Sequence, residues 1–175
     1  MQRFAGLVVP ILAVLWLDLL LDQAVGFATP PASASGDSIA IIVNQSNPVE
    51  NLSAPDLRKI FLGERSHWPN GRRITLVMLA AGQPERKAML REIYHMSESE
   101  FNNHFIQGLF TGEVFLSPKA LANAAEVRKF VFNIPGAIGF LRASDADASV
   151  KVVRVDGHLP EDKEYGIRVQ GRSIK

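Results

Sequence analysis

The sequence predicts an α/β fold, a three-layer sandwich in which helices cover both faces of a mainly parallel sheet. The first observation behind this prediction is the uninterrupted apolar run at residues 39–43, because such runs are typical of strands buried on both faces. The second is that strand patterns alternate along the chain with helix patterns that open at capping or turn residues. No internal repeat is visible in the sequence.

The first helix is predicted shortly after the first strand. Asn47-Pro48 ends the strand with turn residues, and Ser53 then fits the N-cap of a helix. Pro55 falls in the first helical turn, and Asp56 stands three residues after the cap, as in a capping box. Gly63 is placed to stop the helix. The residues expected on its apolar face are Leu57, Ile60 and Phe61.

Further elements are predicted after the Asn70-Gly71 turn. They are a strand at 74–79, a helix opening at 82–84, a helix capped by Ser97 and Glu100, a helix starting at Ser117-Pro118, and strands at 137–141 and 150–155. The apolar positions assigned to the three helices are Met89, Leu90, Ile93, Tyr94, Phe101, Phe105, Leu109, Leu121, Ala124, Val127 and Val131.

The amino-terminal segment is predicted to be a cleaved signal peptide. Arg3 gives a small positive start, residues 4–17 are apolar, and Gly26-Phe27-Ala28 offers small residues where a signal peptidase reads. Asp18 and Asp22 interrupt the stretch before it reaches the roughly 20 apolar residues of a membrane span, and retention as an anchor is the alternative. We expect export to the bacterial periplasm. The predicted boundaries are 1–28 for the signal peptide, 29–37 for a flexible spacer, 38–160 for the folded domain and 161–175 for a final strand or tail.

Composition and motifs argue against several classes of function. The formal net charge is +1 and basic residues are spread along the chain, so we expect no nucleic-acid partner. The absence of cysteine excludes disulfides, thiolate metal sites and cysteine nucleophiles. None of the four histidines, His67, His95, His104 and His158, belongs to a metal-binding motif, and His104 is interpreted as a partly buried structural residue. We therefore predict a protein that is not an enzyme and that holds no metal or cofactor.

The best candidate for a ligand site is the turn between residues 79 and 86. In open α/β sheets, ligands bind beyond the carboxyl ends of the strands. Gly82 and Gln83 would present backbone amides there, and Arg86 would add a positive charge. The alternative is that Gly82 only allows a tight turn and Arg86 is a solvated surface residue, since Glu85 in the same turn would repel an anion.

Two stretches of the sequence carry a resemblance to a known family. The stretch from Ile39 to Trp68 resembles the phosphate ABC-transporter substrate-binding proteins of the type 2 periplasmic-binding-protein superfamily, and residues 133–141 (NIPGAIGFL) are similar to a later strand entry of that family. The matching residues of the first stretch are Val43, Asn44, Asn47, Pro48, Leu52, Ser53, Leu57, Ile60, Phe61, Gly63 and Trp68. The resemblance covers about residues 38–157 and implies one lobe of such a protein.

The resemblance implies a partner and a ligand. The ligand would be a small oxyanion, phosphate among them, and the partner an ABC permease or another periplasmic protein. A homodimer is a further option, because one lobe alone would bury too little of a small ligand unless another chain supplied a second wall. Asn44, Ser46 and Asn47 join Gly82, Gln83 and Arg86 as candidate ligand-binding residues, although the turn at 44–48 is better interpreted as architecture.

Two departures from the family pattern bear on function. Gly82-Gln83-Pro84 stands where the family has Ser-Gly-Thr, and no arginine ends the strand before it. The first-lobe sequence expected upstream of Ile39 is replaced by the predicted signal peptide and spacer. The family's phosphate-binding residues therefore cannot be assigned here, only the location of the site. The alternative function is a non-catalytic protein-interaction module that has lost the ligand, and a periplasmic hydrolase is a third interpretation without a supporting motif.

Overall fold

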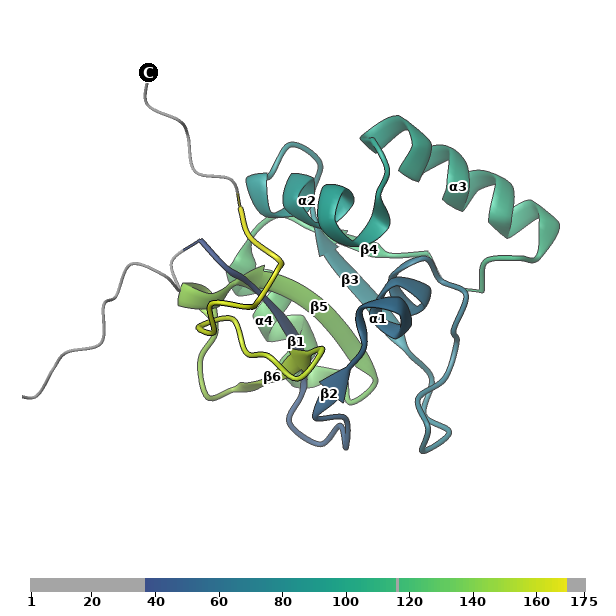
Figure 1. The fold of residues 1–175 in the computed structure, drawn as a ribbon. Coiled ribbons are helices and arrows are strands. Elements are labelled where there is room, and N and C mark those ends of the chain that lie inside the picture. Colours follow the sequence, from purple (N-terminus) through teal and green to yellow (C-terminus); the bar gives the residue numbers. More distant parts are fainter. Residues whose placement is uncertain (1–36, 116, 170–175) are drawn as a thin grey trace, which may run out of the picture. The chain divides into compact units, whose positions relative to one another are not determined.

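The structure is a computed structural model that describes residues 37–115 and 117–169 (Figure 1). The predicted signal peptide and nearly all of the predicted spacer lie outside these residues. Within the described ranges, no helix combines the length and the apolar character that crossing a membrane requires.

A six-stranded sheet forms the centre of the domain, and the strand order is β2-β6-β1-β5-β3-β4. The strands are β1 (Ile39–Asn44), β2 (Asn51–Leu52), β3 (Thr75–Leu79), β4 (Lys119–Leu121), β5 (Ala137–Arg142) and β6 (Val150–Val155). The pairs β2–β6, β3–β4 and β3–β5 are parallel, so the sheet is mixed, with three of its five pairings in the predicted direction. The central strand β1 is antiparallel to both of its neighbours, β5 and β6.

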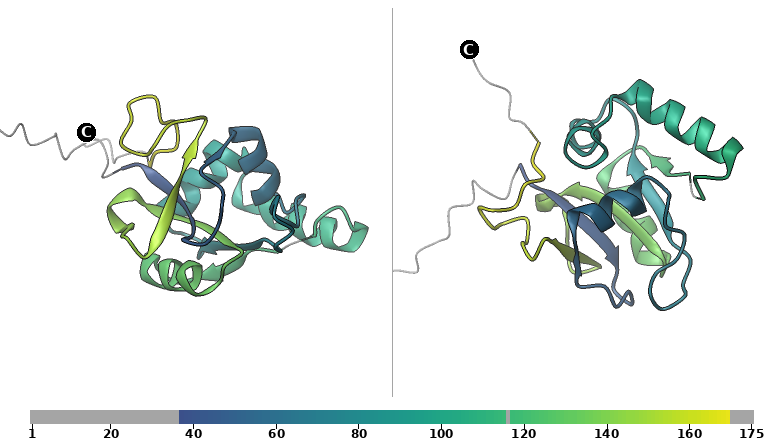
Figure 2. Two further views of the ribbon diagram at one scale, coloured as in Figure 1. Left: turned by 90° about the horizontal axis from the view of Figure 1, so that it is seen from below. Right: turned by 45° about the vertical axis from the view of Figure 1, so that its right-hand side comes forward.

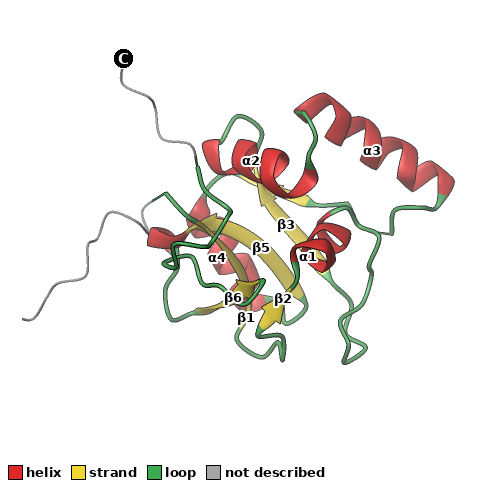
Figure 3. Ribbon diagram, viewed as in Figure 1, coloured by secondary structure: helices red, strands yellow, loops and turns green. Residues whose placement is uncertain are grey.

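Helices cover both faces of this sheet, as the three-layer prediction requires (Figures 2 and 3). They are α1 (Ala54–Phe61), α2 (Pro84–Met89), which runs on into the π-helical turn η1 (Leu90–Tyr94), α3 (Glu98–Thr111) and α4 (Ala124–Asn133). Neighbouring residues of β5 show the two faces. A Cβ on Gly139 would lie 3.1 Å from Val127 of α4, whereas the Phe140 ring meets Phe61 of α1 at 6.1 Å between centroids.

The first helix forms as its capping pattern predicts. The Ser53 hydroxyl accepts a hydrogen bond from the Asp56 backbone N–H at 3.1 Å, and the Asp56 carboxylate in turn bonds the hydroxyl at 2.7 Å. Gly63 follows the C-cap residue Leu62 and has a φ of +76°, a left-handed conformation that glycine adopts without strain and that stops the helix. The residues predicted for the apolar face, Leu57, Ile60 and Phe61, are all buried.

The next helices confirm most of the predicted faces. Ser97 and Glu100 form a complete capping box at the start of α3. Phe101 and Phe105 are buried beneath α3, whereas the placement of Leu109 on the apolar face is wrong, because Leu109 is 50% exposed. His104 is half-buried, and its Nε2 lies 3.1 Å from the Leu62 carbonyl oxygen, which fits the structural role predicted for it.

The prediction of a helix starting at Ser117-Pro118 is wrong. Residues 119–121 form the edge strand β4, which pairs with β3, and the helix begins only at Ala124. Asn123 is the true N-cap, because its side chain accepts the Glu126 backbone N–H at 2.9 Å. Val127 and Val131 are buried as predicted.

The segment after β6 packs back onto the core. Ile167 and Tyr165 are buried, and the backbone N–H of Ile39 donates to the Ile167 carbonyl at 2.9 Å. The Tyr165 hydroxyl donates to the Ile39 carbonyl at 2.6 Å. This segment therefore takes the place beside the start of β1 that β6 leaves when it ends at Val155.

Candidate functional site

A cavity of about 160 Å³ opens at the carboxyl ends of β3 and β5. Because β3 and β5 are parallel, their carboxyl ends share one edge of the sheet, and the starts of α2 and α4 lie at the same edge. The space matches about five water-sized groups, so the cavity suits a small solute and not a drug-sized ligand. The residues that line this pocket are Leu79, Gln83, Glu85, Asn123, Ala124, Arg142 and Asp145.

Arg142 is the cation of the pocket, and it comes from the last position of β5. Its Nε–H donates to the carboxylate of Glu85, in the first turn of α2, and its Nη1 lies 3.4 Å from Asp37 Oδ1. The Glu85 carboxylate raises the pKa of the Arg142 guanidinium, and Asp37 and Asp145 act in the same direction. Three carboxylates therefore surround one guanidinium.

The ligand-binding residues predicted from the sequence do not include Arg142, because that prediction rests on the strand that precedes the Gly82 turn. The signal was present, because an arginine directly follows Leu141 at the end of a predicted strand. Its place at the pocket depends on the parallel pairing of β5 with β3, which brings the two strand ends together and which the sequence does not display.

Gly82 and Gln83 lie where the sequence predicts, at the turn beside the pocket. Gly82 has a φ of +90° with open space around its Cβ position, so backbone conformation and not crowding favours glycine there. The Gln83 amide donates to the Ala122 carbonyl at 3.3 Å, which ties the turn before α2 to the turn before α4. Gln83 thus closes one side of the pocket.

Arg86 does not line the pocket, and the interpretation of it as a solvated surface residue is wrong. It is only 5% exposed. Its Nε and Nη2 donate to the Glu98 carboxylate at 3.1 and 2.5 Å, and its Nη1 donates to the Leu79 carbonyl at 3.0 Å. The guanidinium also lies 4.9 Å from the centre of the Phe101 ring. Arg86 thus joins the end of β3 to the start of α3.

Asn44, Ser46 and Asn47 lie at the opposite ends of the strands from the pocket. In the antiparallel pairing of β1 with β5, Ile39 faces Arg142 and Val43 faces Ile138, so β1 ends where β5 begins. The six candidate ligand residues therefore do not form one site.

The turn that follows β1 is held by hydrogen bonds within the fold. The Asn44 amide donates to the Val131 and Phe132 carbonyls at 2.9 and 2.6 Å, which satisfies the end of α4. Its Oδ1 accepts from the Ser46 N–H and hydroxyl, and the Asn47 Oδ1 accepts from the Val49 N–H at 3.0 Å. These contacts agree with the architectural interpretation of the turn.

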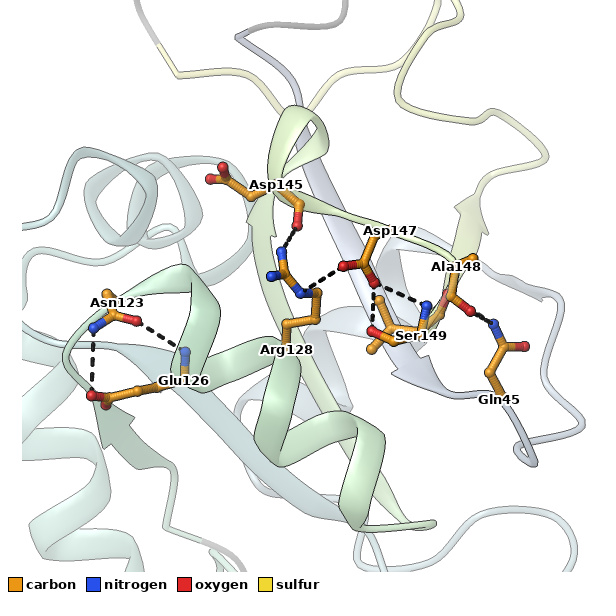
Figure 4. A network of polar contacts seen from close by, with 9 residues as sticks. Gln45, Asn123, Glu126, Arg128, Asp145, Asp147, Ala148 and Ser149 are labelled. Atoms are coloured by element: carbon orange, nitrogen blue, oxygen red, sulfur yellow. Dashed lines mark hydrogen bonds and ion pairs between the residues drawn. The ribbon is translucent and has the colours of Figure 1, made fainter.

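A polar network fixes the loop that carries Asp145 (Figure 4). Arg128 of α4 donates to the Asp145 carbonyl at 2.5 Å and pairs with the Asp147 carboxylate at 3.0 Å. Ser149 donates its N–H and hydroxyl to Asp147, and these bonds lower the Asp147 pKa. Gln45 donates to the Ala148 carbonyl at 2.9 Å from the other side. The rim of the pocket beside Asp145 is therefore anchored to α4.

Among the described residues, no group of three or more histidine, aspartate or glutamate side chains could hold a metal ion. His67 Nδ1 lies 2.9 Å from the Ser66 hydroxyl, and His95 Nδ1 lies 2.9 Å from the Arg91 carbonyl oxygen. The pocket itself offers one guanidinium, two carboxylates and amides from two helix starts. This chemistry suits hydrogen bonding and charge pairing with a small polar solute.

The chain matches a known protein family and resembles several solved structures. A family model described as the PBP superfamily domain matches residues 33–169. The chain is also similar to an ABC-type phosphate transport receptor from Vibrio cholerae, with 22% identity and a TM-score of 0.59 over 71% of this chain and 48% of that one.

Two further solved structures give a similar result. A Clostridium perfringens protein assigned as a phosphate ABC transporter substrate-binding protein, solved with bound phosphate, has 25% identity and a TM-score of 0.54 over 69% of this chain and 46% of its own. PstS from Borrelia burgdorferi has 14% identity and a TM-score of 0.54 over 69% of this chain and 47% of its own. The chain thus spans about half the length of these solved proteins.

Proposed function

Because the chain belongs to the family of the PBP superfamily domain, we propose that it is a solute-binding protein that holds a small oxyanion, such as phosphate, at the carboxyl ends of β3 and β5. The observation that carries this proposal is the pocket of about 160 Å³ with Arg142 at its wall. The similarity to phosphate transport receptors supports the choice of ligand class. The role we propose is binding, without catalysis.

The carboxylates that pair with Arg142 affect how an oxyanion can bind in the pocket. Arg142 is already paired with Glu85 and Asp37, so an oxyanion competes with two carboxylates for the guanidinium. Asp37 is the partner we expect to leave, because its side chain is 56% exposed and lies 3.4 Å away, whereas Glu85 is buried. Exchanging one exposed carboxylate for a ligand oxygen on the same guanidinium changes the local charge little.

Titration calorimetry of the purified protein with phosphate, and separately with sulfate, tests this proposal. We expect saturable heat at micromolar to millimolar phosphate, weaker at high salt because the pocket is partly open to solvent. No heat at millimolar concentrations of either anion would count against an oxyanion receptor.

Export and delivery to a transporter are the wider part of the proposal. The predicted signal peptide would take the protein to the periplasm, and an ABC permease would receive the solute. Fractionation of the native bacterium, followed by mass spectrometry of the intact protein, tests export. Recovery of the protein in the periplasm, shortened near residue 28, is the expected result, and a cytosolic full-length protein would contradict it.

A second candidate function is a protein-interaction module without a small ligand. Two observations favour it: the paired state of Arg142, and the bare apolar side chains of α3, where Phe110 is 90% exposed. Crosslinking in intact cells separates the two functions. A specific crosslinked partner, together with no anion binding in calorimetry, would favour the module.

A further inference from the structure

The outer face of α3 carries an apolar surface that the described residues leave uncovered. Ile106, Leu109 and Phe110 stand at positions i, i+3 and i+4, so their side chains are neighbours on one face of the helix. They are 57%, 50% and 90% exposed, and Phe115, just past the helix, is 57% exposed. We call these four residues the α3 ridge.

The described residues cover the inner face of α3 and leave this ridge bare. Phe101 and Phe105 pack onto the core, and a side chain at Gly108 would collide with Val114, which folds back against the helix. The Phe115 N–H donates to the Gly63 carbonyl at 2.9 Å, so the flank after the helix is tied down beside α1. The exposure of the ridge is therefore a property of a well-anchored helix.

The ridge is free of formal charge. Between Phe101 and Gly112 the sequence has no acidic or basic side chain apart from the half-buried His104. The nearest carboxylates, Glu100 and Glu113, stand at either end, and Glu100 is engaged in the capping box. A surface of this kind meets a copy of itself without like-charge repulsion, whereas a basic or acidic partner would find no counter-charge on it.

We propose that the α3 ridge is the interface of a homodimer, in which two copies of α3 pack antiparallel about a two-fold axis midway between Ile106 and Phe110, so that Ile106 of each copy meets Phe110 of the other. With about 200 Å² for a whole side chain of this size, the exposed fractions leave about 500 Å² of ridge on each copy. Two copies would bury about 1,000 Å², the lower limit of specific interfaces, so we expect a dissociation constant in the micromolar range. This inference is independent of the proposed solute binding, because no ridge residue lines the pocket.

Sedimentation of the purified full-length chain tests the dimer. The monomer mass is 19.2 kDa, and we expect twice that mass at concentrations of tens of micromolar. Phe110→Glu should weaken association at least about thirtyfold, the effect of losing one interface hot spot. Because Phe110 is almost fully exposed, this variant should keep the circular dichroism and the unfolding midpoint of the wild type.

The matched control is Phe132→Glu. Phe132 is 55% exposed and belongs to α4, on the other face of the sheet, so this variant should remain dimeric. The two-fold axis has its own test, because residue 106 of one copy meets residue 110 of the other. Ile106→Lys and Phe110→Glu should each be monomeric, and an equimolar mixture of the two should recover a dimer.

A wild-type chain that sediments at 19.2 kDa up to about 100 μM would overturn the proposal, because an interface of this size should form by then. A dimer that persists in Phe110→Glu would also overturn it, since association would then use another surface. Loss of the dimer in Phe132→Glu, with Phe110→Glu unaffected, would place the interface on α4.

Discussion

Arg142, the last residue of β5, donates its Nε–H to the carboxylate of Glu85 in the first turn of α2, 57 residues earlier in the chain. Both residues line the pocket, so the pair governs how the pocket meets a charged solute. The guanidinium attracts an anion, and the carboxylate competes with it for the same donors.

Arg142→Ala should weaken phosphate binding more than tenfold. One charge-assisted hydrogen bond is worth about 1.5–3 kcal/mol, and Arg142 is the cation among the residues that line the pocket. Calorimetry measures the change, and Arg154→Ala, an exposed arginine on β6, is the control that should leave affinity unchanged. Equal affinity in wild type and Arg142→Ala would move the site elsewhere.

The partner substitution Glu85→Gln should change affinity in the opposite direction. Glutamine keeps the shape of the side chain but removes the negative charge that opposes the ligand, so phosphate should bind several-fold more tightly. A decrease in affinity, at unchanged stability, would mean that Glu85 itself contacts the solute.

Arg86→Ala should destabilise the fold by about 2–3 kcal/mol. It removes a buried guanidinium that satisfies the Leu79 carbonyl and the Glu98 carboxylate. Urea unfolding measures the loss. Glu98→Gln should cost less, about 1 kcal/mol, because the side-chain oxygen of glutamine can still accept one of the two hydrogen bonds that Arg86 donates. A loss below about 0.5 kcal/mol for Arg86→Ala would show that this tie contributes little.

The two tyrosines should respond in opposite directions to the same substitution. The Tyr94 hydroxyl is buried without a hydrogen-bond partner among the described residues, so Tyr94→Phe should leave stability unchanged or raise it by up to about 1 kcal/mol. Tyr165→Phe should lose about 1 kcal/mol, because its hydroxyl donates to the Ile39 carbonyl. Urea unfolding of both variants checks the sign, and destabilisation by Tyr94→Phe would reveal a partner for that hydroxyl.

Stability should fall in alkaline solution above about pH 10, the ordinary pKa of tyrosine in an unfolded chain. Burial raises the pKa of Tyr94 and of Tyr165 in the folded protein. The folded state therefore keeps protons that the unfolded state loses, and each tyrosine lowers the unfolding free energy by up to about 1.4 kcal/mol per pH unit. Urea unfolding at pH 10 and 11 should show a shallower decline in Tyr94→Phe than in wild type. Equal slopes would contradict the tyrosine assignment.

Asn44→Ala should destabilise the protein by about 1–3 kcal/mol and leave anion binding intact. The substitution leaves the Val131 and Phe132 carbonyls at the end of α4 without their donor. Urea unfolding and phosphate calorimetry on the same variant separate the two effects. Lost affinity at full stability would instead place a ligand at that edge of the sheet.

Local signals explain why much of the fold could be predicted. Ser53 with Asp56, and Ser97 with Glu100, start helices through bonds between neighbouring residues, so a single sequence displays them. The same signal was available for α4 in Asn123 and Glu126, but Ser117-Pro118 offered an earlier start. The three residues of β4 are too few to show a period.

Strand direction and long-range pairing could not be predicted, because they depend on contacts between residues far apart in the sequence. The run at 39–43 shows that β1 is buried on both faces, and burial is the same for parallel and antiparallel neighbours. Because β1 is antiparallel to β5, Asn44 and Gly82 lie at opposite ends of the strands. Arg86 and Arg142 likewise acquired their roles from partners far along the chain, Glu98 and Glu85.

The pairing of β1 also sets the order in which the protein can be assembled. β1 leaves the ribosome before its partners β5 and β6, and before the Ile167 carbonyl that completes it. At about 5–20 residues per second, roughly 6–25 s of translation separate the first strand from its last partner. The central strand is therefore made before either of its neighbours, and the sheet can be completed only after the chain has been made as far as Ile167.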